Sequence, residues 1–197
     1  MSETPPSPSS EEASRERKAV RMIPFIVGCA LFMQMLDATV VATAIPAMAA
    51  SLGTTAVQMN ISITSYLLAL AVFVPISGWA AERFGARRIF ITAIVLFSLS
   101  SIACAVSQNL IQLVLARIAQ GAAGAMMVPV GRIIMLRKTP KEDLLKAMAF
   151  LAMPALLGPI LGPPVGGFLV TYASWHWIFL INVPVGILGI YLVMCFI

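Results

Sequence analysis

The chain has 197 residues and a formal net charge of +5, with 60% hydrophobic and only 11% charged residues. A water-soluble domain carries about 25% charged residues, so this chain could not cover a soluble domain's surface with polar groups. The composition argues against a soluble enzyme, a disordered chain and a nucleic-acid-binding domain. The mean hydropathy of +0.96 indicates a membrane protein instead.

Residues 1–21 differ from the rest of the chain. The stretch from Met1 to Glu16 is rich in Ser, Pro and Glu and cannot bury apolar surface, so we expect it to be disordered. A basic cluster follows, and its members are Arg15, Arg17, Lys18 and Arg21. We therefore predict a disordered cytoplasmic N-terminus over residues 1–21 and a membrane domain over residues 22–197.

Six apolar segments are each long enough to cross a bilayer, whose hydrocarbon core takes ~20 helical residues. They cover approximately residues 23–47, 57–80, 89–107, 110–135, 144–170 and 177–197. Six such segments joined by short links predict an all-α membrane protein with six transmembrane helices. The sixth ends at the last residue, Ile197, from which we expect the chain to be half of something larger.

Charged residues gather on alternate links between these segments. The links at 51–56, 107–109 and 171–176 contain no Lys, Arg, Asp or Glu, whereas those at 82–88 and 137–143 are charged. Of the 13 basic residues, only Arg117 lies deep inside a segment, and the others fall on one side of the predicted topology. The positive-inside rule places that side, with both termini, in the cytoplasm. The lipid bilayer, not nucleic acid, is the partner that this pattern predicts, in a plasma membrane such as the bacterial inner membrane.

Two ionisable residues lie deep inside predicted spans, where insertion costs on the order of 2.5–3.5 kcal/mol. Asp37 shares a helix face with Gln34, and it is either a proton acceptor facing a water-filled cavity or a hydrogen-bonding post between helices. Arg117 shares a face with Gln120, Gly121 and Gly124. It either binds substrate or tunes a proton-carrying acid, or it pairs with a carbonyl or carboxylate to hold the helices together.

The fifth span is dense in glycine and proline. Its glycines at 158, 162 and 166 are spaced by four and predict close packing on another helix. Its prolines each remove a backbone donor and favour a bend, so the span is either a seal or hinge, or a static packing motif. The residues singled out here are Gly158, Pro159, Gly162, Pro163, Gly166 and Gly167.

The link between the second and third spans has a patterned set of glycines and charges, which are Gly78, Glu82, Arg83, Gly85, Arg87 and Arg88. This link resembles the GxLADRxGRRxx signature of the major facilitator superfamily. Arg117, Gln120, Gly121 and Gly124 resemble its RxxQGxGAA signature, and the fifth span resembles its GPxxGPxxGG antiporter signature. Residues 36–46 resemble the LDxTVVNVALP signature, and residues 175–186 resemble the start of span 6 in the fourteen-span drug:proton antiporter family. Together these five stretches cover about residues 30–190.

The resemblance implies a proton-driven exporter of lipophilic or cationic drugs or metabolites that works by alternating access. It implies that Asp37 and Arg117 couple protons, that the fifth span seals the cavity, and that the link at 78–88 locks one conformation. We expect the substrate cavity to include Gln34, Gln120 and Asn60. No cofactor is expected, because a proton gradient supplies the energy.

The chain departs from the family pattern at three points. Glu82 stands where the family usually has Asp, which lengthens the arm of a gate contact. Ala42 stands where the family has Asn, which removes a polar group from the cavity. The family has twelve or fourteen spans rather than six, so we expect a second six-span half as partner, as a homodimer or as a separate chain.

Other functions remain open at this point. The chain could be a facilitator for a sugar or an organic acid, or a truncated fragment that transports nothing. A membrane-embedded enzyme needs a nucleophile–base pair or metal ligands. His176 is the only histidine, and the cysteines at 29, 104 and 195 have no metal-ligand spacing, so we expect neither an enzyme nor a metal site.

Overall fold

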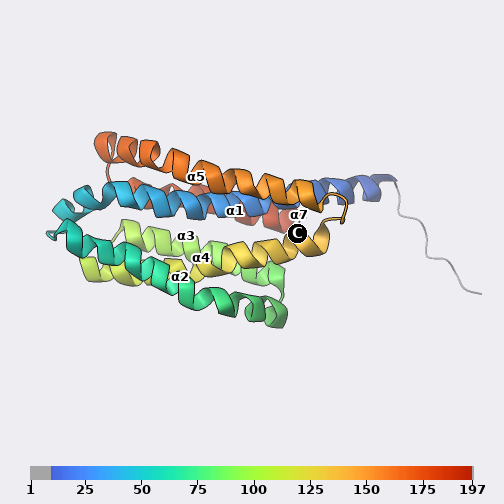
Figure 1. The fold of residues 1–197 in the computed structure, drawn as a ribbon, viewed down its shortest axis with the longest axis horizontal. Coiled ribbons are helices and arrows are strands. Elements are labelled where there is room, and N and C mark those ends of the chain that lie inside the picture. The colour runs from blue at the N-terminus through green and yellow to red at the C-terminus, as the bar shows by residue number, and fades with distance from the viewer. Residues whose placement is uncertain (1–9, 197) are drawn as a thin grey trace, which may run out of the picture.

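A computed structural model describes residues 10–196, and its side chains are described from residue 22 onward, except that of Ala155. This part of the chain is helical apart from short links and has no strand. Six of its helical segments are long and apolar enough to cross a membrane, which confirms the predicted all-α architecture with six transmembrane helices (Figure 1). The helices are α1 (Ser10–Ser51), α2 (Ala56–Phe84), α3 (Ala86–Ala105), α4 (Leu110–Lys138), α5 (Leu144–Tyr172), α6 (His176–Leu180) and α7 (Asn182–Phe196).

Helix α1 begins earlier than the sequence predicts. Its apolar span starts at Met22, close to the expected position, but the backbone is already helical at Ser10. Helix therefore replaces the disorder predicted for residues 10–21, and residues 1–9 lie outside the described part. Residues 10–21 contain neither glycine nor proline, so nothing in this stretch stops a helix that the long span has already nucleated.

Local sequence signals set the other helix ends. Thr55 and Gln58 form a capping box at the start of α2, and Asn109 caps α4 by accepting from the Gln112 backbone N–H. Gly85 alone separates α2 from α3, with a φ of 89° that side-chain-bearing residues rarely adopt. The short links make successive spans antiparallel.

The sixth span is divided into α6 and α7 at Ile181. Pro184 follows this point, and a proline ring clashes with the carbonyl group four residues earlier, which belongs to Leu180. The break therefore comes from the sequence itself. It places Asn182 at the first position of α7, where its side chain is buried.

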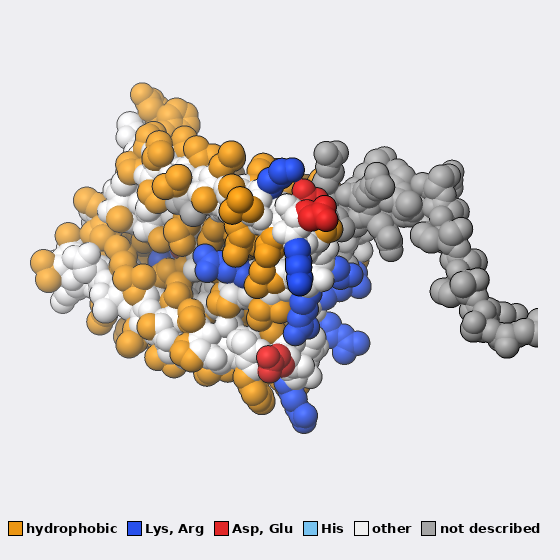
Figure 2. All heavy atoms as spheres, turned by 45° about the vertical axis from the view of Figure 1, so that its right-hand side comes forward, with side chains coloured by type: hydrophobic (Ala, Val, Ile, Leu, Met, Phe, Trp, Pro, Cys, Tyr) orange, Lys and Arg blue, Asp and Glu red, His pale blue; other side chains and the backbone are white. Residues whose placement is uncertain are grey.

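The helices are arranged so that α1, α3 and α4 are the most buried, while α2 and α5 lie at the periphery. Helix α5 packs along α1, and α4 packs against both α2 and α3. The links that follow α2 and α4 lie at the same end as the start of α1 and the end of α7 (Figure 1). Lys and Arg side chains gather at that end, while the rest of the visible surface is mainly apolar (Figure 2).

Candidate functional site

Asp37 and Arg117 form an ion pair in the interior of the domain. The Arg117 Nη1 atom donates to Asp37 Oδ2 at 2.6 Å, and each residue is only 1% exposed. Asp37 lies at the middle of the α1 span, and Arg117 lies two turns into the α4 span. Inside a membrane an isolated charge of either sign is costly, so each residue provides the counter-ion that the other needs.

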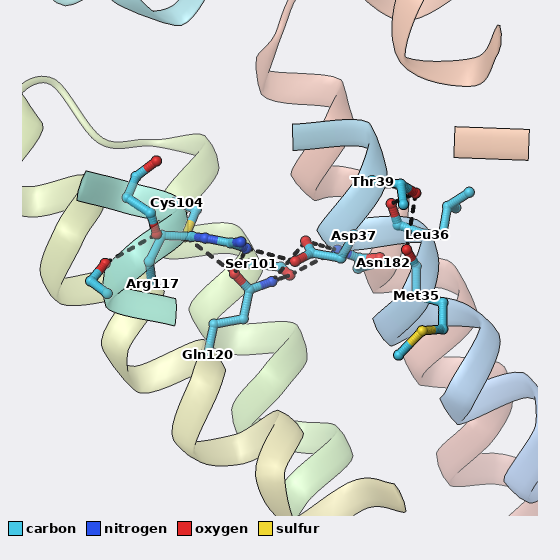
Figure 3. A network of polar contacts seen from close by, with 11 residues as sticks. Met35, Leu36, Asp37, Thr39, Ser101, Cys104, Arg117, Gln120 and Asn182 are labelled. Atoms are coloured by element: carbon cyan, nitrogen blue, oxygen red, sulfur yellow. Dashed lines mark hydrogen bonds and ion pairs between the residues drawn. The ribbon is translucent and has the colours of Figure 1, made fainter. Parts of the chain in front are cut away.

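Three neutral side chains complete a network around this pair (Figure 3). Gln120 Nε2 and Asn182 Nδ2 donate to Asp37 Oδ1 at 3.0 and 2.9 Å, so the carboxylate accepts from three different residues. The same two amide groups lie 2.7 and 3.2 Å from Ser101 Oγ. Arg117 Nη1 also donates to Gln120 Oε1 at 2.7 Å, so side chains from α1, α3, α4 and α7 meet at one point.

Aromatic rings and unpaired polar atoms flank the guanidinium group. The Arg117 Cζ atom lies 4.2 Å from the centre of the Tyr66 ring and 5.9 Å from that of Phe179, which are cation–π distances. Four nearby buried atoms have no hydrogen-bond partner among the described residues: Arg117 Nε, Asn182 Oδ1, Tyr66 Oη and Gln34 Oε1. Buried polar atoms normally have hydrogen-bond partners. These four atoms could therefore each form a further hydrogen bond.

Asp37 had two interpretations from the sequence, and the structure shows the hydrogen bonds between helices that one of them describes rather than an open cavity beside the carboxylate. The carboxylate is enclosed by its donors, and its side chain has no exposed surface. Arg117 pairs with a carboxylate, as one of its two sequence interpretations states, because α1 and α4 turn these two residues toward each other. A pocket at the charged end and a groove between α1 and α5 are lined by other residues.

The three residues predicted to line a substrate cavity do not come together. Gln120 belongs to the Asp37 network. Gln34 is buried and lies near Gly124 and Tyr66 on the neighbouring helices. Asn60 is exposed near the start of α2 and its side chain forms no hydrogen bond with the network. The place of these three residues in a substrate cavity therefore stays a prediction.

The predicted glycine stripe of α5 faces α1. An added Cβ at Gly158, Gly162 or Gly166 would overlap Met35, Thr39 or Thr43, respectively. Thr39 Oγ1 lies 3.3 Å from the Gly158 carbonyl oxygen and joins the two helices. The prolines at 159, 163 and 164 are exposed on the other side, and α5 continues as one helix through them. Gly167 has open space around it, so it is not part of the packed stripe.

The link at 78–88 lies at the charged end of the domain, and most of its side chains are exposed. Glu82, Arg83 and Arg88 are exposed and form no ion pair within the described part of the chain. Arg87 Nη2 donates to the Met194 carbonyl oxygen at 3.3 Å, which ties this link to the end of α7. Gly78 has no neighbour within 4 Å of an added Cβ.

Sequence reasoning missed several members of the network. Asn182 and Ser101 bind the carboxylate or its donors, Cys104 Sγ lies 3.6 Å from Gln120 Oε1, and Tyr66 covers the guanidinium group. The sequence could have pointed to Asn182, because a carboxamide inside an apolar span needs a hydrogen-bond partner, as an acid does. Ser101 and Cys104 carry no such signal, because small polar residues are common in membrane helices.

Two solved structures share this fold. One is the inward-open conformation of the xylose transporter XylE from E. coli, with a TM-score of 0.78 and 16% identity, covering 89% of this chain and 48% of that one. The other is a bacterial homolog of the human lysosomal transporter Spinster, in an inward-facing and unoccupied conformation. It has a TM-score of 0.69 and 17% identity, covering 89% of this chain and 42% of that one. At these identities the similarity shows the fold alone.

Two curated relatives are much more similar in sequence, and both carry the name "Putative multidrug resistance protein MdtD". The protein from Klebsiella pneumoniae subsp. pneumoniae is 52% identical over 177 residues, covering 90% of this chain and 38% of the relative. The protein from Shigella flexneri serotype 5b is 56% identical over 165 residues, covering 84% of this chain and 35% of the relative. The chain thus spans little more than a third of the length of these relatives.

A sequence model of the Major Facilitator Superfamily matches residues 27–197, which include all six membrane spans almost completely. The match agrees with the fold and with the curated relatives. This chain belongs to the Major Facilitator Superfamily.

Proposed function

We propose that this chain is the N-terminal six-helix half of a proton-coupled exporter of lipophilic or cationic drugs or metabolites. It resides in the bacterial inner membrane with both termini in the cytoplasm. The multidrug name of the relatives at 52–56% identity supports the substrate class. The basic residues at one end of the domain (Figure 2) support the orientation, through the positive-inside rule.

The observation that carries the proposal is the buried Asp37–Arg117 network. An ionised Asp37 holds α1 to α4 and α7 through Arg117, Gln120 and Asn182. A proton on Asp37 removes the charge that Arg117 needs, so the protonated and ionised forms favour different arrangements of these helices. Such a difference can shift a transporter between two conformations, and a cationic substrate competes with the proton for the same carboxylate in a conformation in which the network has opened.

Other predicted residues fit this mechanism. The Gly158, Gly162 and Gly166 stripe holds α5 close to α1, which also carries Asp37, so movement of one helix is transmitted to the other. The link at 78–88 acts as the conformational gate. A second six-span half, either another copy of this chain or a separate chain, completes the transport pathway, because sites in such transporters lie between repeats.

Transport by inverted membrane vesicles tests the function. Vesicles that contain the chain are energised to form an inside-acidic pH gradient, and a pH-sensitive dye then reports proton efflux on addition of the lipophilic cation ethidium. We expect ethidium to dissipate the gradient with the wild-type chain but not with Asp37→Asn. Glu142→Gln, an exposed acid-to-amide change, is the matched control and keeps wild-type coupling.

Two results would contradict the proposal. Full proton coupling in the Asp37→Asn variant would remove Asp37 from the mechanism. Dissipation by a sugar or an organic acid but not by lipophilic cations would favour the metabolite facilitator. Cross-linking in the same membranes tests the partner, and a strictly monomeric chain with no transport would leave the truncated-fragment interpretation.

A further inference from the structure

A pocket with four basic side chains opens at the charged end of the domain, between the start of α3 and the end of α4. Its volume is about 480 Å³, within the ~300–1,000 Å³ range of ligand pockets. Arg87 and Arg88 line it from α3, and Arg137 and Lys138 line it from α4. No acidic side chain belongs to this lining in the described residues, so every charged side chain that lines the pocket is positive.

The backbone of α3 contributes to the same potential. The helix begins directly after Gly85, and no side chain caps it. The N–H groups of its first three residues, Ala86, Arg87 and Arg88, have no acceptor within the helix, and all three residues line the pocket. An uncapped helix N-terminus favours a negatively charged group, so backbone and side chains select the same kind of ligand.

The four cations are not neutralised by the side chains that the structure describes. The ion pairs of that part of the chain are Asp37–Arg117 and Asp143–Lys146, and neither involves the pocket. Arg87 donates one hydrogen bond, from Nη2, to the Met194 carbonyl oxygen. The pocket therefore holds several charged donors that face no acidic partner.

The remaining lining of the pocket is apolar. Ile91, Ile134 and Phe84 contribute to it, and Ile134 is buried in the core. Trp79 packs edge-on against Phe84 with ring centroids 6.0 Å apart, and the two residues are 60% and 55% exposed. Exposed aromatic side chains at the end of a span are typical of the membrane–water interface, so the pocket lies at the depth of lipid headgroups.

We propose that this pocket binds the phosphate group of an anionic phospholipid. Basic pockets between transmembrane helices on the cytoplasmic side are known binding sites for anionic headgroups. The phosphate accepts from Arg88, Arg137 and Lys138, while the glycerol and the first acyl carbons lie against Phe84 and Ile91. The bound lipid links α3 to α4, and this role does not depend on what the chain transports.

Native mass spectrometry of the full chain in detergent tests the site, with phosphatidylglycerol and phosphatidylcholine of identical acyl chains as probes. The pocket variant is Arg137→Gln/Lys138→Gln, with Arg88→Gln as a second variant from the other helix. The control is Lys141→Gln/Lys146→Gln, which removes the same charge from exposed positions outside the pocket. We expect the wild type and the control to retain one phosphatidylglycerol, and the pocket variant to retain it at least tenfold less.

Thermal unfolding separates binding from general effects. Phosphatidylglycerol should raise the Tm of the wild type and the control but not that of the pocket variant, whose unliganded Tm should match the wild type. Equal losses in the pocket variant and the control would overturn the proposal, because they would indicate diffuse attraction to the whole basic end. Equal retention of phosphatidylcholine, or an equal rise in Tm with inorganic phosphate, would also overturn it.

Discussion

Removal of the charge on Asp37 should destabilise the domain strongly, because it leaves Arg117 buried without a counter-ion. The ion pair has an N···O distance of 2.6 Å, and both side chains are almost fully buried. Breaking a buried pair by removing one partner costs about 3–5 kcal/mol. Asp37→Asn keeps the size of the side chain, so we expect its loss of unfolding free energy to come from the charge and to fall in that range.

A double-mutant cycle distinguishes the charge effect from a simple loss of packing. Replacing both members of a buried pair with neutral groups is often nearly neutral, so Asp37→Asn/Arg117→Met should be more stable than Asp37→Asn alone. Coupling energies between contacting residues are about 0.5–3 kcal/mol, and we expect the upper part of that range. The exposed pair of Lys146 with Asp143 has an N···O distance of 3.5 Å, and Lys146→Gln should change stability by no more than ~1 kcal/mol.

The assay is reversible unfolding in mixed micelles of a mild detergent and SDS, followed by circular dichroism and tryptophan fluorescence. The reasoning is refuted if Asp37→Asn is as stable as the wild type. It is also refuted if the double variant is less stable than the sum of the two single changes predicts. Either result would mean that the network does not hold α1 to α4 in the membrane-like environment.

Three further predictions test the packing and the network. Gly162→Ala places a Cβ 2.6 Å from the Cβ of a threonine on α1 and should cost about 1–3 kcal/mol, whereas Gly167→Ala meets open space and should be neutral or stabilising in the same unfolding assay. An added Cβ at Gly121 meets the backbone of α2, whereas one at Gly124 makes only contacts of 3.4 Å or more. Heat inactivation of detergent-solubilised protein should therefore be faster for Gly121→Ala and unchanged for Gly124→Ala. Asn182→Ala removes one donor from the buried carboxylate, so it should cost about 1.5–3 kcal/mol and slow ethidium-driven proton efflux from vesicles. Equal stability of the two variants in either glycine pair would contradict the helix packing inferred for that pair. An Asn182→Ala variant with wild-type stability and proton efflux would contradict a role for its hydrogen bond to Asp37.

The sequence was most informative where one physical constraint acts on each residue independently. A residue in a membrane span must be apolar or have a polar partner. Hydropathy therefore located the six spans, and the free-energy cost of burying a charge singled out Asp37 and Arg117. Helical spacing put Gly158, Gly162 and Gly166 on one face. These inferences need no knowledge of which helices are neighbours.

Tertiary structure decided everything that depends on how the helices are turned and which of them meet. Sequence periodicity indicates that Asp37 and Gln34 share a face, but not that this face meets Arg117 rather than a cavity. It gives no reason to join Ser101 of the third span to Asn182 of the sixth, or to separate Asn60 from Gln120. Those outcomes follow from the packing of α1, α3, α4 and α7 around one point, where the free energy of each polar group depends on partners from other helices.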